Sequence, residues 1–140
     1  MRKIVDAALC CDGKMLLCLK EVSHSPGELF WIPPGGKAEP GESDFLAIQR
    51  ELKEELGITP RLFATRGIIL RRYSKHQGDW FGDQIEVQHF VAELDEPVPF
   101  QLLADQQRTI WAPVPPAGGL VLSITEALMI SLRLGGYLHS

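Results

Sequence analysis

The sequence has few cysteines, no long hydrophobic run and no excess of positive charge. Its longest uninterrupted apolar stretches, residues 7–11 and 15–19, are five residues each. They fall far short of the ~18 residues of a membrane-spanning helix and of the ~7–15 of a signal-peptide core. With 140 residues, 45% of them hydrophobic and 23% charged, the composition is that of one ordinary globular domain. We therefore expect a single cytoplasmic domain over residues 1–140 that does not bind membranes.

The three cysteines are Cys10, Cys11 and Cys18. An odd number in a short chain argues against a disulfide framework. Asp12-Gly13 predicts a two-residue hairpin turn, which places each cysteine opposite a different residue, with Cys18 opposite Ala7. We predict reduced thiols, half-buried in strands, in a reducing compartment. A reactive or metal-binding thiol is the alternative.

The negative charge is concentrated in one segment of the chain. Eighteen acidic and 14 basic residues give a net charge of −4, and residues 36–58 hold six of the acids but only three of the bases. Because the chain has no basic field, we do not expect nucleic acid as a partner. A local cluster of acids is more typical of a cation site than of a generally repulsive surface.

The hydrophobic pattern predicts strands together with two helices. Pro33–Gly36 is excluded from helix and from a central strand, because proline lacks the backbone donor and glycine is too free. Gly57 is typical of a helix C-cap, and Ser123-x-x-Glu126 is typical of a capping box. The expected elements are a hairpin over 3–20, an extended piece at 30–32, a helix over 43–56, strands over 61–73, 84–94 and 108–114, and a final helix ended by Gly135-Gly136. We expect loops at 21–29, 74–83 and 95–106.

The helix at 43–56 divides into two faces on a helical wheel. Its expected core stripe consists of Phe45, Ile48, Leu52 and Leu56. Glu51, Glu54 and Glu55 share another face with the small Ala47, while Lys53 points elsewhere. Like charges at this spacing repel each other, so a solvated acidic face is the plain alternative. Clustered carboxylates suit Mg²⁺, which accepts a few carboxylates together with substrate phosphate oxygens.

The spacing around these glutamates is highly specific. Gly36 is followed after five residues by Glu42, and after seven more by the run from Arg50 to Ile58, R-E-L-K-E-E-L-G-I. This segment resembles the Nudix box, G-x5-E-x7-R-E-U-x-E-E-x-G-U with U a bulky aliphatic residue, at all nine specified positions over 23 residues. The preceding run W-I-P-P-G-G-K at 31–37 is also similar to the family's usual lead-in. Strand order and the final helix extend the resemblance over most of the chain.

The resemblance implies a Nudix fold, an α/β (α+β) architecture in which a mixed sheet is sandwiched between helices. It implies hydrolysis of a nucleoside diphosphate linked to another group, with Mg²⁺ or Mn²⁺ as cofactor. Glu51, Glu54 and Glu55 would be metal ligands, together with the backbone carbonyl of Gly35. Arg50 would orient the glutamates by bidentate pairing.

Further roles follow from the same resemblance. Glu42 would support the junction between loop and helix and is a candidate for a second metal ion. Substrate contacts are expected from Lys20, Gly36, Lys37 and Glu42. For Lys20 a solvated edge lysine is the equal alternative. Glu51 is the first candidate for the general base and an acid from a distant loop the second, and Asp105 is a candidate for an extra metal ligand.

Four features outside the box are weaker candidates. His24 and the basic cluster at 71–76 could contact substrate, although exposed positions without a role are the more frequent case. Trp80-Phe81 could stack on a base or form part of a dimer interface. His89 shares a strand face with aliphatic residues, which predicts a core histidine whose hydrogen bonds are satisfied.

The expected substrate is an ordinary or oxidised (d)NTP, cleaved to a nucleoside monophosphate and pyrophosphate, because the short chain is most similar to the small nucleotide-cleaving members. Dinucleoside polyphosphates or ADP-ribose-type compounds are the alternatives, and Tyr73 lies near the position of a tyrosine typical of dinucleoside polyphosphate hydrolases. A non-catalytic, nucleotide-binding module is the alternative from another class. The partner is a small-molecule nucleotide, and a homodimer is left open.

Overall fold

The computed structural model describes residues 2–21, 27–65, 68–74, 79–95, 108–114, 120–121 and 123–139, with the backbone alone at 2, 68–74, 79–85, 121 and 123. His24, part of the basic cluster at 71–76, and Asp105 lie outside these residues. The strands and helices are β1 (Arg2–Cys11), β2 (Lys14–Glu21), β3 (Leu29–Ile32), β4 (Gly35–Lys37), α1 (Asp44–Leu56), β5 (Phe63–Ala64), β6 (Ile68–Ser74), β7 (Asp79–Glu93), β8 (Arg108–Ala112), β9 (Leu120–Val121) and α2 (Ser123–Leu134).

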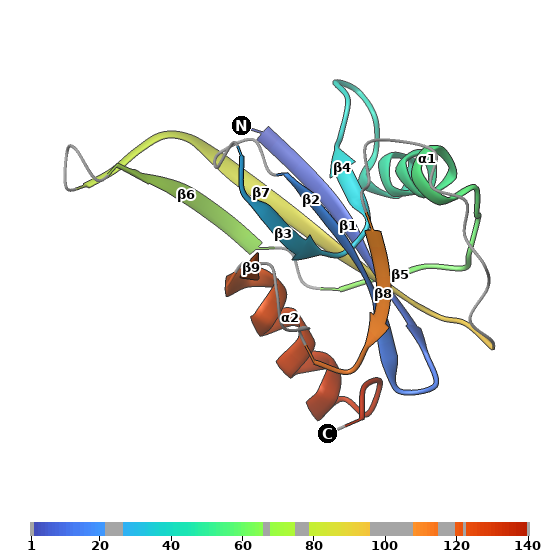
Figure 1. The fold of residues 1–140 in the computed structure, drawn as a ribbon. Helices are drawn as coiled ribbons and strands as arrows, with labels where there is room; N and C mark the ends of the chain where they lie inside the picture. The colour runs from blue at the N-terminus through green and yellow to red at the C-terminus, as the bar shows by residue number, and fades with distance from the viewer. Residues whose placement is uncertain are drawn as a thin grey trace.

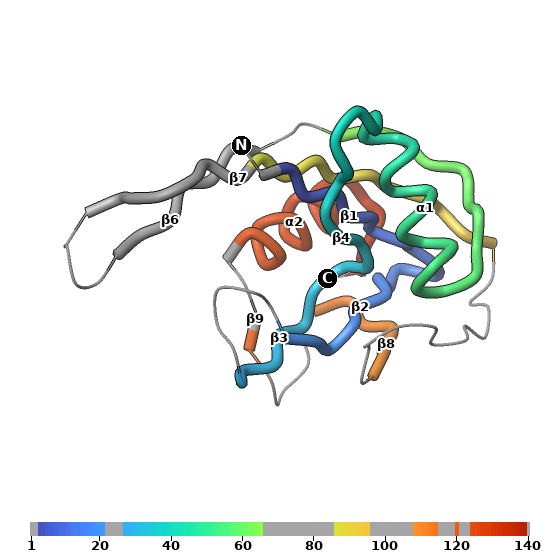
Figure 2. The backbone as a smooth tube through the Cα atoms, turned by 90° about the horizontal axis from the view of Figure 1, so that it is seen from above, coloured from blue at the N-terminus to red at the C-terminus, as the bar shows by residue number. Residues whose placement is uncertain are grey.

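The strands form one mixed sheet with the order β5-β7-β1-β2-β3-β9, to which β4 adds beside β1, β6 beside β7 and β8 beside β2. The β1–β7 and β3–β9 pairs are parallel and the other pairs are antiparallel. Helices α1 and α2 lie on opposite faces of this sheet (Figure 1, Figure 2). The expected fold, a mixed sheet between helices, is confirmed.

The alternation of side chains along β1 explains the two layers. Val5, Ala7 and Leu9 are buried in the core cluster with α1, while Ala8 and Cys10 are buried in the cluster with α2. A strand that is apolar on both faces must be covered on both. β1 is therefore the central support of both helices.

β1 and β2 pair only near their turn, where Cys10 lies opposite Met15 and Cys11 opposite Lys14, as predicted. Beyond that point the two strands separate. The prediction that Cys18 lies opposite Ala7 is wrong, because Cys18 pairs instead with Ile32 of β3 and Thr109 of β8. All three cysteines are buried, more deeply than the half-buried positions predicted for them, because both faces of these strands are covered.

The segment 33–37 lies along the part of β1 that β2 leaves unpaired. The amide of Ala7 donates to the carbonyl of Pro34 at 2.9 Å, and Asp6, Val5 and Ile4 pair with the three residues of β4. β4 pairs with β1 alone, which agrees with its exclusion from a central strand. The separation of β1 and β2 thus makes room for a short strand at the centre of the molecule.

Helix α1 has the C-cap that its sequence predicts, and it begins at Asp44, one residue later than predicted, because Ser43 is its N-cap. The Ser43 hydroxyl accepts a hydrogen bond from the amide of Leu46 at 3.2 Å, and Gly57 adopts φ 71° and donates to the carbonyl of Lys53 at 3.0 Å. Ile48, Leu52 and Leu56 are buried as expected. Phe45 is not part of the core stripe, because 46% of it is exposed and its ring meets only the edge of the core, 6.5 Å from the ring of Phe90.

The strands around residues 74–83 are longer than predicted. β6 continues to Ser74 and β7 begins at Asp79, so residues 79–83 belong to a strand and not to a loop.

The final helix ends at Leu134, before the two glycines, as expected. Among the described residues, no helix has the length and hydropathy needed to cross a membrane.

Candidate metal-binding and catalytic site

The site forms where β4 lies against β1 and faces α1. A side chain at Gly35 would overlap the carbonyl oxygen of Val5 and come within 2.6 Å of the Cα atom of Asp6. Only glycine allows the two backbones to approach this closely. The close approach holds the Gly35 carbonyl and amide beside the helix.

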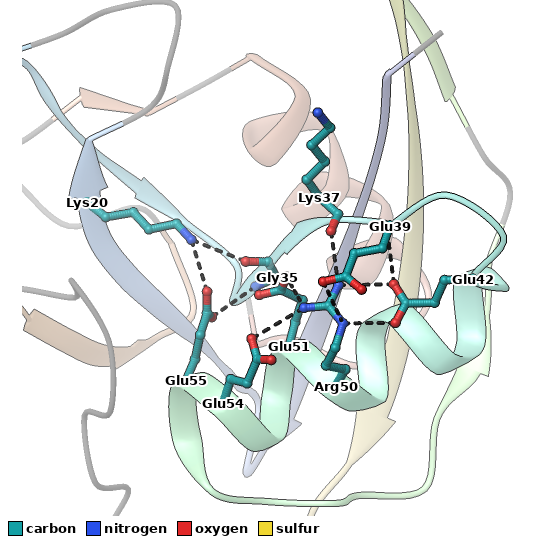
Figure 3. Close-up of polar contacts among 9 residues, drawn as sticks. All are labelled: Lys20, Gly35, Lys37, Glu39, Glu42, Arg50, Glu51, Glu54 and Glu55. Carbon is teal, nitrogen blue, oxygen red and sulfur yellow. Dashed lines mark hydrogen bonds and ion pairs between the residues drawn. The ribbon is translucent and has the colours of Figure 1, made fainter.

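Three glutamates of α1 face this strand, as the helical wheel predicts (Figure 3). The exposed fractions of the side chains of Glu51, Glu54 and Glu55 are 13%, 57% and 8%. Ala47, on the same side of the helix, is fully buried. The three carboxylates therefore differ in exposure to solvent, from the exposed Glu54 to the buried Glu55.

Arg50 ties the loop before the helix to the glutamates on it. Its Nε and Nη2 atoms donate to the two oxygens of Glu42 at 2.8 and 3.0 Å. Its Nη1 atom donates to Glu51 at 2.9 Å and to Glu54 at 3.3 Å. Nη2 also donates to the backbone carbonyl of Lys37 at 3.1 Å. The bidentate partner of Arg50 is therefore Glu42, while each of the two glutamates on the helix receives a single bond.

Lys20 approaches from β2, on the opposite side of the glutamate cluster (Figure 3). Its Nζ atom lies 3.2 Å from the Gly35 carbonyl oxygen and 3.2 Å from Oε1 of Glu55. The other oxygen of Glu55, Oε2, accepts a hydrogen bond from the Gly35 amide at 3.2 Å. Lys20 is thus the counter-ion of a buried carboxylate and not a solvated edge lysine.

The two best-paired carboxyl groups have pKa values shifted in opposite directions. Burial raises the pKa of Glu55 above its ordinary value, against the opposing effect of the Lys20 ammonium. Hydrogen bonds from Arg50 lower the pKa of Glu42 to about 2. The contrast follows from which effect is larger, since burial dominates at Glu55 and hydrogen bonds from Arg50 dominate at Glu42.

The donor atoms of this site suit a hard divalent cation. Carboxylate oxygens and a backbone carbonyl are the ligands that Mg²⁺ and Mn²⁺ prefer. A Cβ atom at Gly36 would lie 2.6 Å from the carboxylate of Glu51, so this glycine keeps space beside that group. Among the described residues, no three carboxyl or imidazole groups already converge as a metal centre. Arg50 and Lys20 provide the positive charge that holds the carboxylates in place.

A second polar pair lies beside the site and was not expected. Nδ1 of His89 on β7 lies 2.5 Å from Oδ1 of Asp6 on β1, and Asp6 is paired in register with Gly35. Burial raises the pKa of Asp6 despite the opposing effects of His89 and Lys20. His89 is buried as predicted, but its Nε2 atom has no hydrogen-bond partner among the described residues. The one signal in the sequence is Asp6 itself, a lone acid in an apolar strand.

The structure brings together most of the residues that the sequence singles out. Two hydrogen-bonded groups lie side by side: Lys20 with Gly35 and Glu55, and Arg50 with Glu42, Glu51 and Glu54 (Figure 3). Gly36 lies against the carboxylate of Glu51. Lys37 contributes its backbone carbonyl, and its side chain is exposed. Asp105 is outside the described residues, so its expected place near the metal ligands stays a prediction.

Comparisons with known proteins identify the family and the fold of this chain. A family model described as "NUDIX domain" matches residues 1–119. The chain is similar to the CTP pyrophosphohydrolase of Escherichia coli (strain K12), with 45% identity over 58 residues, which are 41% of this chain and 42% of that protein. It is also similar to the asymmetrical bis(5'-nucleosyl)-tetraphosphatase of Caenorhabditis elegans, with 29% identity over 102 residues, 71% of this chain and 68% of the relative.

A solved structure, the solution structure of the E. coli ORF135 protein, matches with a TM-score of 0.68 at 26% identity. The match covers 96% of this chain and 92% of that one. The similarity therefore extends over nearly the whole fold, well beyond the segment around α1.

Proposed function

Because the chain belongs to the Nudix hydrolase family, we propose that it is a Mg²⁺-dependent enzyme that hydrolyses the pyrophosphate linkage of a nucleoside diphosphate joined to another group. The leading substrate is an ordinary or oxidised (d)NTP, with a nucleoside monophosphate and pyrophosphate as products. Mn²⁺ is the alternative metal ion.

One observation carries this proposal. The carbonyl of Gly35 on β4 lies beside the helix face of α1 that bears Glu51, Glu54 and Glu55, and Lys20 and Arg50 flank these groups. This combination offers oxygen ligands for a divalent ion and positive charge for phosphates. The repulsion between the like charges on this helix face is offset by ion pairs with Arg50 and Lys20.

The bound metal ions would supply charge neutralisation of the polyphosphate and a lower pKa for the attacking water. Glu51, Glu54, Glu55 and the Gly35 carbonyl would hold them. Arg50 keeps Glu51 in one orientation through a 2.9 Å bond. Glu51 is our first candidate for the group that takes the proton from water, and an acid from a distant loop is the second. Asp105 is a candidate for an extra metal ligand. Lys20 and Lys37 are the candidates for contacts with phosphate oxygens.

The relatives support two substrate classes. The E. coli relative is named for CTP, a nucleoside triphosphate, which supports the leading proposal. The C. elegans relative is named for a dinucleoside tetraphosphate and matches a larger share of this chain, which supports the second. The two classes are distinguished by their products, since only the first gives a monophosphate and free pyrophosphate from a triphosphate.

The test is a panel of (d)NTPs, oxidised dGTP, ADP-ribose and diadenosine polyphosphates, incubated with Mg²⁺ and analysed by separation of the nucleotide products. The Glu54→Gln and Glu55→Gln variants are measured alongside. Glu126→Gln is the matched control, because Glu126 is exposed on α2 across the sheet. We expect turnover of a triphosphate that is lost on chelation, falls by orders of magnitude in both site variants and is unchanged in the control.

Three results would count against parts of the proposal. Unchanged activity in Glu54→Gln and Glu55→Gln would refute the assignment of the site. Turnover of diadenosine polyphosphates alone would select the second substrate class. Tight nucleotide binding without any turnover would indicate the non-catalytic module.

A further inference from the structure

The ammonium of Lys20 lies between two of the oxygens assigned to a metal ion. Its Nζ atom is 3.2 Å from the Gly35 carbonyl oxygen and 3.2 Å from Oε1 of Glu55 (Figure 3). The exposed fractions of the two side chains are 22% for Lys20 and 8% for Glu55. This is an enclosed ion pair and not a surface contact, so screening by salt reduces it little.

The oxygens around this ammonium are held by other parts of the fold. Gly35 is fixed by the pairing of β4 with β1, and its amide donates to Oε2 of Glu55 at 3.2 Å. Lys20 is fixed from the other side, because its strand pairs with β3 at Phe30. The three groups form a closed ring in which every member has a partner. The fold therefore places the Lys20 ammonium between the Gly35 carbonyl and the Glu55 carboxylate.

An ammonium and a divalent ion compete for the space between these two oxygens. Both oxygens keep a second lone pair, but two positive charges within a few ångströms repel each other strongly in a poorly solvated site. A metal ion therefore binds the Gly35 carbonyl and Glu55 together more tightly after Lys20 has moved away. The long, flexible side chain of lysine allows this movement without a change in the backbone.

We infer that Lys20 is the resident counter-ion of the metal site, which occupies the place of the metal between Gly35 and Glu55 and must be displaced by it. This inference rests on the proposed function, which assigns those two oxygens to a metal ion. The metal ion then binds only those molecules in which Lys20 has moved away from Gly35 and Glu55. Because they are a fraction of the population, the apparent affinity for metal is lower than the affinity of the oxygen ligands without Lys20. Displacement also leaves the ammonium free for the anionic substrate.

The test is the binding of Mn²⁺ alone, followed by the electron paramagnetic resonance signal of free Mn²⁺ at one neutral pH. Lys20→Met removes the competing charge and retains the volume of the side chain. We expect this variant to bind Mn²⁺ about fivefold or more tightly than the wild type, the lower end of ordinary coupling between two sites. Lys20→Arg keeps the charge and should keep the weaker affinity.

Two further variants control for charge and folding. Lys53→Met makes the same change in net charge at an exposed position of α1, and screening should limit its effect to less than about twofold. Lys20→Gln is a second neutral variant, whose amide can still donate to the Gly35 carbonyl, and circular dichroism shows whether each variant is folded. A merely structural role for Lys20 predicts weaker Mn²⁺ binding on its removal, which is the opposite sign.

Mn²⁺ binding to the wild type and to Glu55→Gln distinguishes an error in the inference from an error in the proposed function. If Mn²⁺ binding does not depend on Glu55, the metal site itself is refuted and the inference falls with it. If Mn²⁺ binding depends on Glu55 but neither neutral Lys20 variant binds more tightly than Lys53→Met, the inference alone is overturned. Tighter binding in the neutral variants and not in Lys20→Arg supports it.

Discussion

Glu42 and Arg50 are joined by two hydrogen bonds, from Nε to Oε2 at 2.8 Å and from Nη2 to Oε1 at 3.0 Å. Glu42 precedes α1 and Arg50 lies in its middle. The remaining donor nitrogen of Arg50 points to Glu51 and Glu54. One planar group therefore fixes the start of the helix and the orientation of its carboxylates together.

Arg50→Lys should lower kcat/KM by about ten- to a hundredfold, the usual effect of losing a group that orients metal ligands. An ammonium can replace the charge but cannot reproduce the fork that reaches three carboxylates at once. Steady-state kinetics and thermal melting measure the two effects, and we expect a much smaller change in Tm than in kcat/KM. Arg61→Lys is the control, since Arg61 is exposed and lies over the ring of Phe63. Equal activity in the two variants would contradict the role of Arg50.

The stabilising effect of Glu42 should depend on pH. Hydrogen bonds from Arg50 lower its pKa from 4.5 to about 2. A lowered pKa means that the folded state favours the carboxylate, so this stabilisation is complete above 4.5 and is lost as the pH falls toward 2. We expect the difference in unfolding free energy between wild type and Glu42→Gln to narrow across that window in urea titrations. Glu126→Gln is the control, and a constant difference for Glu42→Gln would refute the explanation.

Gly35→Ala and Gly36→Ala should have different consequences. A methyl group at Gly35 meets the backbone of Val5 and Asp6, which cannot move without separating β4 from β1. One at Gly36 meets only the end of the Glu51 side chain. We expect Gly35→Ala to lower both the unfolding free energy and the activity. Gly36→Ala should lower the activity while it changes the unfolding free energy by less than about 1 kcal/mol. Urea titrations measure the unfolding free energies of the two variants, and steady-state kinetics measure their activities. Equal losses of unfolding free energy in Gly35→Ala and Gly36→Ala would contradict the prediction.

The Asp6–His89 pair should show coupling in a double-mutant cycle. Each side chain is buried against the other, with exposed fractions of 14% for Asp6 and 4% for His89. Removal of one side chain leaves the other buried without its hydrogen bond, which should lower the free energy of unfolding by about 1–3 kcal/mol. We expect Asp6→Leu and His89→Leu each to destabilise the fold, and the double variant to cost less than the sum. Additive losses in urea titrations would show that the pair has no energetic coupling.

The local features of the site could be predicted from the sequence. The helix that ends at Leu56, its C-cap at Gly57 and the common face of the glutamates follow from spacing alone. These features depend on interactions between residues a few positions apart, which a one-dimensional pattern records. The burial of Ile48, Leu52 and Leu56 follows from the same periodicity.

The long-range features could not be predicted in this way. The position of Cys18 depends on where β1 and β2 separate, which is set by the strand that lies beside β1 and not by the hairpin turn. Phe45 lies at the end of the apolar stripe, and only the extent of the neighbouring strands decides that it is exposed. The partners of Lys20 and of Asp6 come from residues 15 to 83 positions away. No local pattern contains that information.

The parallel pairing of β1 with β7 has a consequence for the order of folding. Arg2 pairs with Ile85 and Cys10 with Glu93, so the two strands meet only after a long loop of chain has closed. Phe90 and Ala92 of β7 complete the core cluster that also holds Ile48 and Leu52 of α1. Closing long loops is slow, because the entropy must be lost before the contacts form. During synthesis the helix that bears the glutamates therefore leaves the ribosome well before the β7 residues of its core cluster.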